Sequence, residues 1–348
     1  MTNPDPSTTP ASPDGVTCRA IGGEGELELF NRLPYVTNDE FAGDLADGRR
    51  RPDWMWVALR GGRPVARAAW WTRRAGNPPL LLDVFDVDDA APDRVAVGEH
   101  LLRTAAAAVL PEGGPRPQYV RFTPPRWRDD PAVRPAVEAR MAALERTGAR
   151  LFVERLRLEW RAGTPLAEPT GRLGFRGTDR EEMIGLMAGV LDGTLDAHSR
   201  ADLARAGATG TDPVRAADAA ADDASRRRAG ADARRAVAAG QYDGEFRMYA
   251  TPPGWHRVGL APGGEPVGFV VPARNAYNPI IAYIGVLPAY RGHGYVDDLL
   301  AEGTRLLAGE GAPRIRASTD VTNVPMAHAF ARAGYVDFEH QIDMTWRT

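Results

Sequence analysis

The stretch IIAYIGVLPAYRGHGYVDDLL, residues 280–300, decides the fold of this chain. Its apolar opening predicts a buried strand over 280–286, which ends at Leu287 and Pro288. A turn with two glycines follows, Arg291-Gly292-His293-Gly294, and a helix is expected over 296–308. Unpaired amides and the dipole at such a helix start favour an anion, and glycine lets the backbone approach a phosphate closely.

A glycine pair between a strand and a helix is weak evidence when taken alone, because ordinary strand-to-helix turns also use glycine. A second motif, ASTDVTNVPMAHAFARAGY at 317–335, follows at a fixed separation. Together the two motifs resemble the acetyl-CoA-binding half of the GNAT superfamily of N-acyltransferases. The residues that match its pyrophosphate signature, R/Q-x-x-G-x-G/A, and the strand before it are Val286, Pro288, Arg291, Gly292 and Gly294.

The resemblance implies that acetyl-CoA is the acyl donor and that no metal is needed. In that family the loop amides hold the pyrophosphate, and the free amides of the preceding strand pair with the pantetheine arm. An asparagine, here Asn323, contacts the coenzyme beside the thioester. The implied coenzyme-binding residues are Ile284, Gly285, Val286, Leu287, Arg291, Gly292, His293, Gly294, Tyr295, Val296, Asn323 and Phe330.

Three positions depart from the family pattern. The final Gly/Ala of the signature is Val296, and Phe330 stands where many members have a tyrosine that protonates the leaving thiolate. The glutamate that many members use as a base has no clear counterpart on the strand before Val286. Asp297 and Asp298 begin the helix, where acidic residues complement the dipole but oppose a strongly negative ligand. The resemblance therefore supports the family's fold and coenzyme site in this chain better than it supports the family's catalytic acid and base.

The implied chemistry is direct attack of a neutral amine on the acetyl thioester, which needs a base and an oxyanion donor. Asp320, at the end of the strand over 314–318, is the first candidate for the base; it also suits an ammonium anchor or the start of a turn. Tyr283 is a second candidate that relays a proton through water, and its alternative is core packing. A backbone N–H near Val286 is the expected oxyanion donor.

The order of elements occurs twice along the chain. The first half predicts strands over 54–59, 65–71, 80–87 and 119–122, helices over 95–110 and 133–147, and a closing strand over 151–160. The second half predicts strands over 257–260, 265–271, 280–286 and 314–318, helices over 296–308 and 325–333, and a closing strand over 335–346. The endings LERTGARLFVERLRLEWR and FARAGYVDFEHQIDMTWR agree in pattern. We therefore expect an α/β fold with a mixed sheet, in two tandem GNAT-like domains.

The expected organisation is a disordered tail over 1–15, a degenerate GNAT-like domain over 16–161, and an acetyl-CoA-binding catalytic domain over 172–348. Residues 162–171 are the linker, and the Ala/Asp/Arg-rich stretch over 201–240 is expected to be helical with a solvated face. The alternative for the helices of this part is a roof over the acceptor pocket, which residues 181–199 suit better than the region around Arg227. The first half has no glycine pair after its third strand, so we predict that it does not bind acetyl-CoA. Its tryptophans, Trp54, Trp56, Trp70 and Trp71, favour a core or a domain interface over a substrate surface.

The composition of the chain limits the kinds of partner and the compartment that we expect for it. The formal net charge is -3, which favours neither nucleic acid nor an anionic membrane. Cys18 is the single cysteine, and it predicts a reducing compartment, the cytoplasm, with no nucleophilic role. No signal peptide or membrane-spanning run is found. GNAT domains often pair, so the resemblance leaves a homodimer open.

Three functions compete at this stage. The first is an N-acetyltransferase that acts on a small-molecule amine. The second is an inactive GNAT-like module that binds CoA or a protein partner, because the usual tyrosine and glutamate are missing. The third is transfer of a longer acyl group or an aminoacyl group on the same fold.

Overall fold

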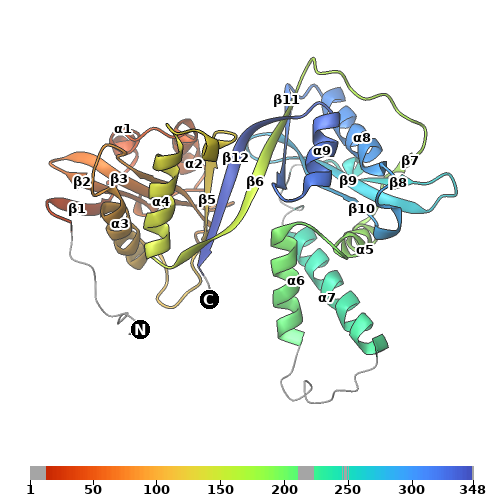
Figure 1. Ribbon diagram of the computed structural model, residues 1–348, viewed down its shortest axis with the longest axis horizontal. Helices are drawn as coiled ribbons and strands as arrows, with labels where there is room; N and C mark the ends of the chain where they lie inside the picture. The colour runs from red at the N-terminus through yellow and green to blue at the C-terminus, as the bar shows by residue number, and fades with distance from the viewer. Residues whose placement is uncertain (1–12, 211–222, 245, 247–248, 250, 347–348) are drawn as a thin grey trace. The chain divides into compact units, whose positions relative to one another are not determined.

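The computed structural model describes residues 13–210, 223–244, 246, 249 and 251–346. The chain forms two compact units: unit 1 comprises Met1–Glu154 with His340–Thr348, and unit 2 comprises Arg155–Glu339. Most of the tail expected over 1–15 lies outside the described residues. The mixed α/β class expected from the sequence is confirmed (Figure 1).

Unit 1 is built on a mixed sheet in the order β1-β2-β3-β4-β5-β12. All neighbours are antiparallel except β4 and β5, which run parallel. Glycines 61 and 62, both at positive φ, form the expected hairpin turn between β2 and β3. The strands are β1 Val16–Ala20, β2 Met55–Arg60, β3 Arg63–Trp71, β4 Leu81–Val87, β5 Gln118–Thr123 and β12 Val336–Trp346, and the helices are α1 Leu27–Phe30, α2 Phe41–Ala46, α3 Arg94–Val109 and α4 Arg134–Arg146.

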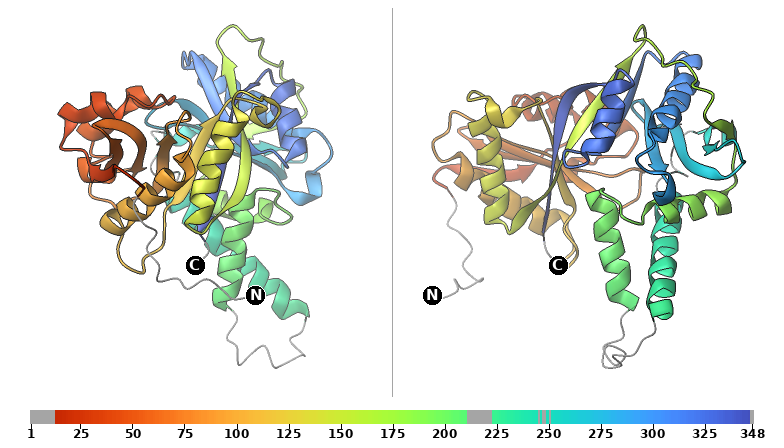
Figure 2. Two further views of the ribbon diagram at one scale, coloured as in Figure 1. Left: turned by 60° about the vertical axis from the view of Figure 1, so that its left-hand side comes forward. Right: turned by 45° about the vertical axis from the view of Figure 1, so that its right-hand side comes forward.

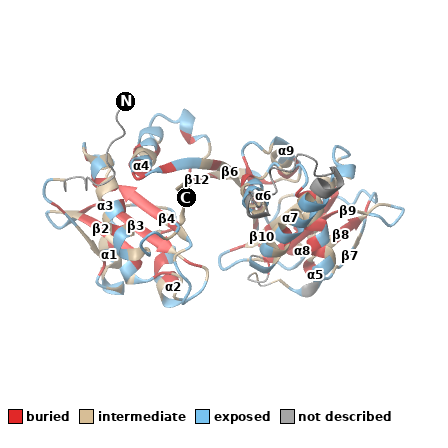
Figure 3. Cartoon of the chain, turned by 90° about the horizontal axis from the view of Figure 1, so that it is seen from below, coloured by how far each residue is buried: buried red, intermediate tan, exposed pale blue. Residues whose placement is uncertain are grey.

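The core of unit 1 covers both faces of its sheet. One cluster packs Trp70, Phe85 and Trp127 with apolar residues of α3 and α4, and the other packs Phe30 and Phe41 against β2 and β3. Trp54 and Trp70 are buried in the first cluster, so the core reading of these two tryptophans is confirmed. Figure 3 shows the buried positions gathered along β2, β3 and β4, while the outer sides of the helices are exposed.

Unit 2 repeats this plan in the order β6-β11-β10-β9-β8-β7. Helices α8 and α9 pack on one core cluster, and α5 and α7 pack on another. Helix α6 runs beside α7 in both views of Figure 2. The strands are β6 Ala149–Arg161, β7 Gly174–Arg176, β8 Arg257–Leu260, β9 Pro266–Arg274, β10 Pro279–Val286 and β11 Arg314–Asp320, and the helices are α5 Arg180–Val190, α6 Ala197–Gly210, α7 Asp223–Gly244, α8 Tyr295–Gly309 and α9 Val324–Arg332.

The closing strands differ from the prediction. Residues 155–161 of β6 pair with β11 of unit 2, in the register Arg155↔Asp320 to Arg161↔Arg314. Residues 340–344 of β12 pair with β5 of unit 1, in the register His340↔Thr123 to Met344↔Tyr119. The expectation that each half is closed by its own last strand, over 151–160 and 335–346, is therefore wrong. The two endings share one apolar pattern, so either strand suits either sheet, and long-range packing decides the choice.

Candidate active site

The two parallel strands of unit 2 separate soon after they meet. β10 and β11 are paired at a single position, Ile280↔Arg316. On its other edge β10 stays paired with β9 as far as Val286↔Gly268. A wedge therefore opens between β10 and β11 along the rest of β10.

Two amides of β10 point into this wedge. Leu287 donates its N–H to the carbonyl oxygen of Val267, 2.9 Å away, toward β9. Because the backbone groups of a strand alternate in direction, Gly285 also faces β9, and Ile284 and Val286 face the opposite edge. In the part of the chain that the structure describes, no acceptor is found for the N–H of Ile284 or Val286 on that edge. The strand thus offers spaced donors to an extended ligand.

The loop before α8 forms a cradle of backbone amides. Gly292 and Gly294 have φ values of 81° and 76°, a left-handed conformation that strains other residues. Gly294 is also the N-cap of the 15-residue helix α8. The five successive amides of residues 292–296 have no acceptor among the described residues. Together with the helix dipole they can hold an anion.

The cradle is open to a ligand. A Cβ placed on Gly292 would have no heavy atom within 4 Å, and one on Gly294 would have none closer than 3.8 Å. Gly292 and His293 are exposed, and Val296, the departure from the family signature, is half-buried. The surroundings of both glycines are therefore open, and no packed side chain of the described residues closes off the loop there.

Arg291 is engaged with main-chain oxygens. Its guanidinium donates to the carbonyls of Val286 at 3.1 Å, Val190 at 2.9 Å and Gly193 at 3.4 Å. These bonds tie the loop to the end of α5. Arg291 therefore shapes the cradle from behind.

A second arginine, Arg172, was not found by sequence reasoning. It donates to the carbonyls of His293 at 3.0 Å and Gly294 at 3.2 Å, and it pairs with the carboxylate of Asp298. No local pattern marks it, because it lies more than a hundred residues before the loop.

The acidic residues at the start of α8 are neutralised. Asp298 pairs with Arg172, and Asp297 pairs with Arg332 at 2.7 Å. The objection that these carboxylates would repel an anion is therefore weakened.

Aromatic rings border the cradle. The rings of His293 and Tyr295 are stacked with centroids 6.1 Å apart, and Tyr290 meets Tyr295 edge-on at 6.3 Å. The guanidinium of Arg172 lies 5.2 Å from the ring centre of Tyr295. These contacts hold the loop in shape.

The residues of the second motif have different surroundings. Asn323 is the N-cap of α9 and its side chain makes no capping bond, so its amide is available to a ligand. Phe330 is 2% exposed and packs edge-on against Tyr335 with ring centres 5.0 Å apart. Phe330 is thus a core residue, and its side chain offers no surface to a coenzyme. The contact implied for it by the resemblance is therefore dropped.

Asp320 is almost fully buried, at 1% exposure. Its Oδ2 accepts the N–H of Ala197 at the start of α6, 2.7 Å away, and its Oδ1 lies 3.3 Å from Nε of Arg155 without hydrogen-bond geometry. Its carbonyl accepts the N–H of Asn323, so the turn expected at this position is present. Burial is the main cause that raises the pKa of Asp320, and the bond from Ala197 opposes it.

Further charged groups surround Asp320. Asp196 lies 3.7 Å from Arg155 and accepts the N–H of Ser199, and His198 acts on Asp320 electrostatically. Sequence reasoning did not find this group, because α6 and β11 are far apart in the chain. The link joins the first turn of α6 to the end of β11.

Tyr283 lies in an aromatic cluster on the α5 side of the sheet. Its ring stacks on Phe269 with centroids 5.4 Å apart, and it meets Phe246 edge-on at 5.8 Å. His256 also packs against Phe246, and burial lowers the pKa of this imidazole, so it is neutral at neutral pH. The core-packing alternative for Tyr283 therefore holds for its ring.

Two other expectations from the sequence concern the cysteine and membrane-spanning helices. Burial raises the pKa of Cys18 to about 11, so its thiol is protonated at neutral pH and is a poor nucleophile. The helices that the structure describes include none with the length and apolar content of a membrane span.

Residues 227–335 match the sequence model of the Acetyltransferase (GNAT) family. The fold is similar to that of a GCN5-related N-acetyltransferase from Sphaerobacter thermophilus, with a TM-score of 0.54 and 14% identity over 96% of each chain. It is also similar to a tandem GNAT protein from the clavulanic acid biosynthesis pathway, with a TM-score of 0.52 and 14% identity over 95% of this chain and 98% of that one. No curated protein matches the sequence.

A mixed sheet with a splayed strand pair and an amide cradle at a helix start defines a GNAT-type acyltransferase fold. Residues 227–335 thus match the GNAT acetyltransferase family, in agreement with the resemblance noted for residues 280–346. Acyl transfer is the general chemistry of that family.

Proposed function

We propose that unit 2 transfers an acetyl group from acetyl-CoA to the amine of a small molecule by direct attack. One observation carries the proposal: the five consecutive amides of residues 292–296, which find no acceptor in the described part of the chain, stand at the end of a strand whose free edge opens a wedge. A diphosphate on the cradle places a flexible arm along that wedge.

The acyl donor would extend from the loop before α8 along the free edge of β10. Its pyrophosphate would accept hydrogen bonds from the loop amides, and its pantetheine arm would pair with the amides of Ile284 and Val286. Asn323, at the start of α9, would contact the coenzyme beside the thioester. The side chain of Arg172 adds positive charge close to the loop.

The reaction needs few groups. The amine nitrogen attacks the thioester carbon, the C–N bond forms, the C–S bond breaks, and the nitrogen loses a proton while the thiolate gains one. A free amide of β10 would donate to the carbonyl oxygen as negative charge develops there, which is worth ~3 to 4 kcal/mol at other acyl-transfer sites. Holding both reactants in line supplies several kcal/mol more.

The roles of the two catalytic candidates differ. Tyr283 would relay the amine proton through water, since it lies on β10 just before the amides that hold the arm. The burial of Asp320 and its bond to Ala197 favour a positioning role, in which its carboxylate fixes the start of α6 beside the end of β11. The amine would then enter from the side of α5 and α6.

A second candidate function is a module that binds CoA without turnover. It is favoured by the burial of Phe330 at the position of the family's acid and by the burial of Asp320. Both functions use the same cradle and wedge.

Two measurements separate these functions. Titration of the full chain with acetyl-CoA tests the cradle, and thiol release from acetyl-CoA with a panel of small amines tests turnover. Binding with turnover supports the transferase, and binding without turnover on any amine favours the module. Absence of binding to any CoA species would refute both.

A further inference from the structure

Unit 1 contains a cavity of about 410 Å³ at the ends of β4 and β5, beside α4. That volume is in the range of small-molecule sites, ~300 to 1,000 Å³. β4 and β5 are paired in parallel only at Leu81↔Gln118 and Leu82↔Tyr119, so the two strands separate before they reach the cavity. The cavity therefore lies where the two parallel strands of the unit 1 sheet separate.

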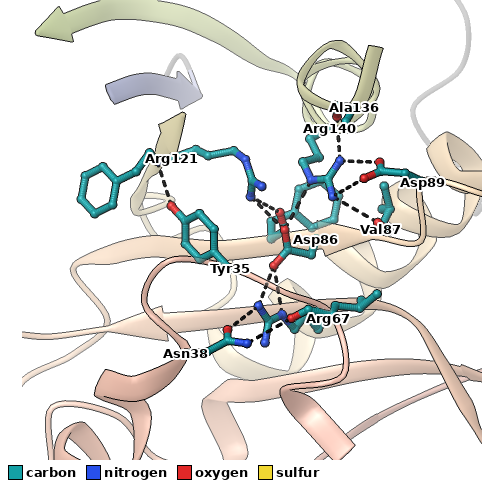
Figure 4. Close-up of polar contacts among 12 residues, drawn as sticks. Tyr35, Asn38, Arg67, Asp86, Val87, Asp89, Arg121, Ala136 and Arg140 are labelled. Carbon is teal, nitrogen blue, oxygen red and sulfur yellow. Dashed lines mark hydrogen bonds and ion pairs between the residues drawn. The ribbon is translucent and has the colours of Figure 1, made fainter. Parts of the chain in front are cut away.

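In unit 1 the wedge is filled by side chains of the protein itself. Arg121 donates to the carbonyl of Phe85 at 3.1 Å and to the carboxylate of Asp86 at 3.0 Å. The hydroxyl of Tyr35 accepts the N–H of Phe122 at 2.8 Å (Figure 4). The carbonyl of Phe85 on β4 and the N–H of Phe122 on β5 thus already have partners inside the wedge, which leaves an extended arm less free strand edge to follow than in unit 2. Any ligand of unit 1 must lie outside this closure and be compact.

Arg32, Arg63, Arg121 and Arg140 line the cavity, and Arg67 lies behind its wall on the far side of Asp86. Figure 4 shows Arg67, Arg121 and Arg140 converging on Asp86, with contacts of 2.9, 3.0 and 3.4 Å. Asp86 is 1% exposed. Burial raises the pKa of this carboxyl, but the three guanidinium groups hold it below its ordinary value, so it is ionised.

The carboxylates of the wall already have partners. Asp89 pairs with Arg140 at 2.6 Å, and Asp88 pairs with Arg63 at 3.2 Å and accepts the N–H of Ala90. The negative charge of these carboxylates is therefore balanced by arginines, and the wall is not suited to binding a cation.

Donors of the wall lack partners. In the described residues Arg32 has no ion-pair partner, and it is exposed at the cavity. The hydroxyl of Thr123, which is 3% exposed, and Nε of Arg121 have no hydrogen-bond partner within the part of the chain that the structure describes. A buried polar group without a partner costs about 1 to 3 kcal/mol, which a bound acceptor would recover. Apolar side chains, among them Val87, Val133 and Val137, line the rest of the cavity.

We propose that this cavity binds a small organic carboxylate with an apolar body. Its carboxylate accepts from Arg32 and from the Thr123 hydroxyl, and its body lies against the valines of β4 and α4. A guanidinium matches a carboxylate in geometry, and the closed wedge sets the size limit. The site lies wholly in unit 1, and its existence does not depend on the transferase function of unit 2.

The test uses the full chain and two probe acids, benzoate and hexanoate, with benzamide and hexanamide as neutral controls. Titration calorimetry and NMR chemical-shift changes measure binding to the wild type and to Arg32→Gln and Thr123→Val. Arg74→Gln removes another exposed arginine of unit 1 and serves as the matched control. Arg32 is a surface residue, so its variant folds even if the Thr123 variant does not.

We expect binding of at least one acid, no binding of the amides, and at least a tenfold loss of affinity in Arg32→Gln but not in Arg74→Gln. Retained affinity in Arg32→Gln, or equal binding of acid and amide, would overturn the proposal. Saturating acetyl-CoA should leave the acid bound, and displacement would instead place the acid in unit 2. If inorganic phosphate bound as tightly as the two acids, the apolar body would make no contribution to binding, and the proposed ligand class would be wrong.

Discussion

Nδ1 of His340 lies 3.2 Å from Oε1 of Glu154, and this pair joins the two chain segments that make up unit 1. The indole of Trp127 donates to the same oxygen at 2.9 Å, and Arg128 donates to the other oxygen at 2.8 Å. Burial raises the pKa of Glu154, but these bonds together bring it down to about 2.

This pKa predicts how the stability of unit 1 depends on pH. Because the pKa of Glu154 is lower in the folded state than its ordinary value of 4.5, its carboxylate stabilises unit 1 above pH 4.5. That contribution is lost as the pH falls from about 4.5 toward 2. Glu154→Gln should lower the free energy of unfolding by about 2 kcal/mol at pH 7, and the difference from the wild type should shrink by pH 3.5. Thermal unfolding at pH 7, 5 and 3.5 measures it, with the exposed Glu112→Gln as control; a difference independent of pH would contradict it.

The closing strands predict a crossed pattern of destabilisation. Ile342, fully buried in the core of unit 1, and Leu158, 3% exposed in the core of unit 2, are each distant in sequence from most of their core partners. Truncation of such residues to alanine costs about 2 to 5 kcal/mol. Ile342→Ala should raise amide hydrogen exchange in β2–β5, and Leu158→Ala should raise it in β9–β11. If Ile342→Ala instead raised exchange in β9–β11, or Leu158→Ala raised it in β2–β5, the strand assignment would be wrong.

The cradle predicts the effect of a side chain at Gly292. Gly292→Val should reduce acetyl-CoA affinity at least 100-fold, because the branched side chain fills the space before the amides. Gly311→Val is a matched control: Gly311 also has a positive φ, 75°, and open space around it, but it lies beyond the other end of α8. Both variants bear a similar backbone strain of about 1 to 2 kcal/mol. Calorimetric titration should separate them, and equal affinities would mean that the cradle is not the coenzyme site.

Tyr283→Phe tests the proton relay. The variant keeps the ring and its stacking on Phe269 and loses only the hydroxyl. We expect kcat to fall on the order of 10- to 100-fold, with the KM for acetyl-CoA within a factor of about two. An unchanged kcat across the pH range would leave Tyr283 with its packing role alone.

Asp320 is tested by two substitutions. Asp320→Ala removes the acceptor for Ala197 and should spare acetyl-CoA binding while it lowers turnover. Asp320→Asn keeps an acceptor of the same shape, so a positioning role predicts that most of the turnover returns. If the asparagine variant were as inactive as the alanine variant, Asp320 would be the base. Steady-state kinetics with the best amine of the panel decides between these roles.

The local elements were predictable from sequence. The strand predicted over 280–286 differs from β10 by one residue at its start, and the helix predicted over 296–308 differs from α8 by one residue at each end, because apolar periodicity and the glycine turn are local signals. The helices over 95–110 and 133–147 end where Pro111 and Gly148 indicate. Strand β1 and the short helices α1 and α2 were not predicted, since segments this short carry little periodicity.

The long-range parts of the site were not predictable. The bonds from Arg172 to the loop join residues that are far apart in the chain, and no spacing rule connects them. The burial of Phe330 and the bond between Asp320 and α6 depend on which faces pack together. The cavity of unit 1 was also missed, because its wall draws on five separate segments whose charged residues look like ordinary surface arginines and aspartates in the sequence.

The pairing of β12 with β5 has a consequence for biosynthesis. A ribosome releases β1 to β5 long before residues 340–346 emerge, so the edge of β5 waits without its neighbour while all of unit 2 is made. Unit 2, whose β6 has already been synthesised, can close first. The domain encoded first would then be the last to reach its native state, and cutting the gene between the halves would give two proteins that each carry the wrong final strand.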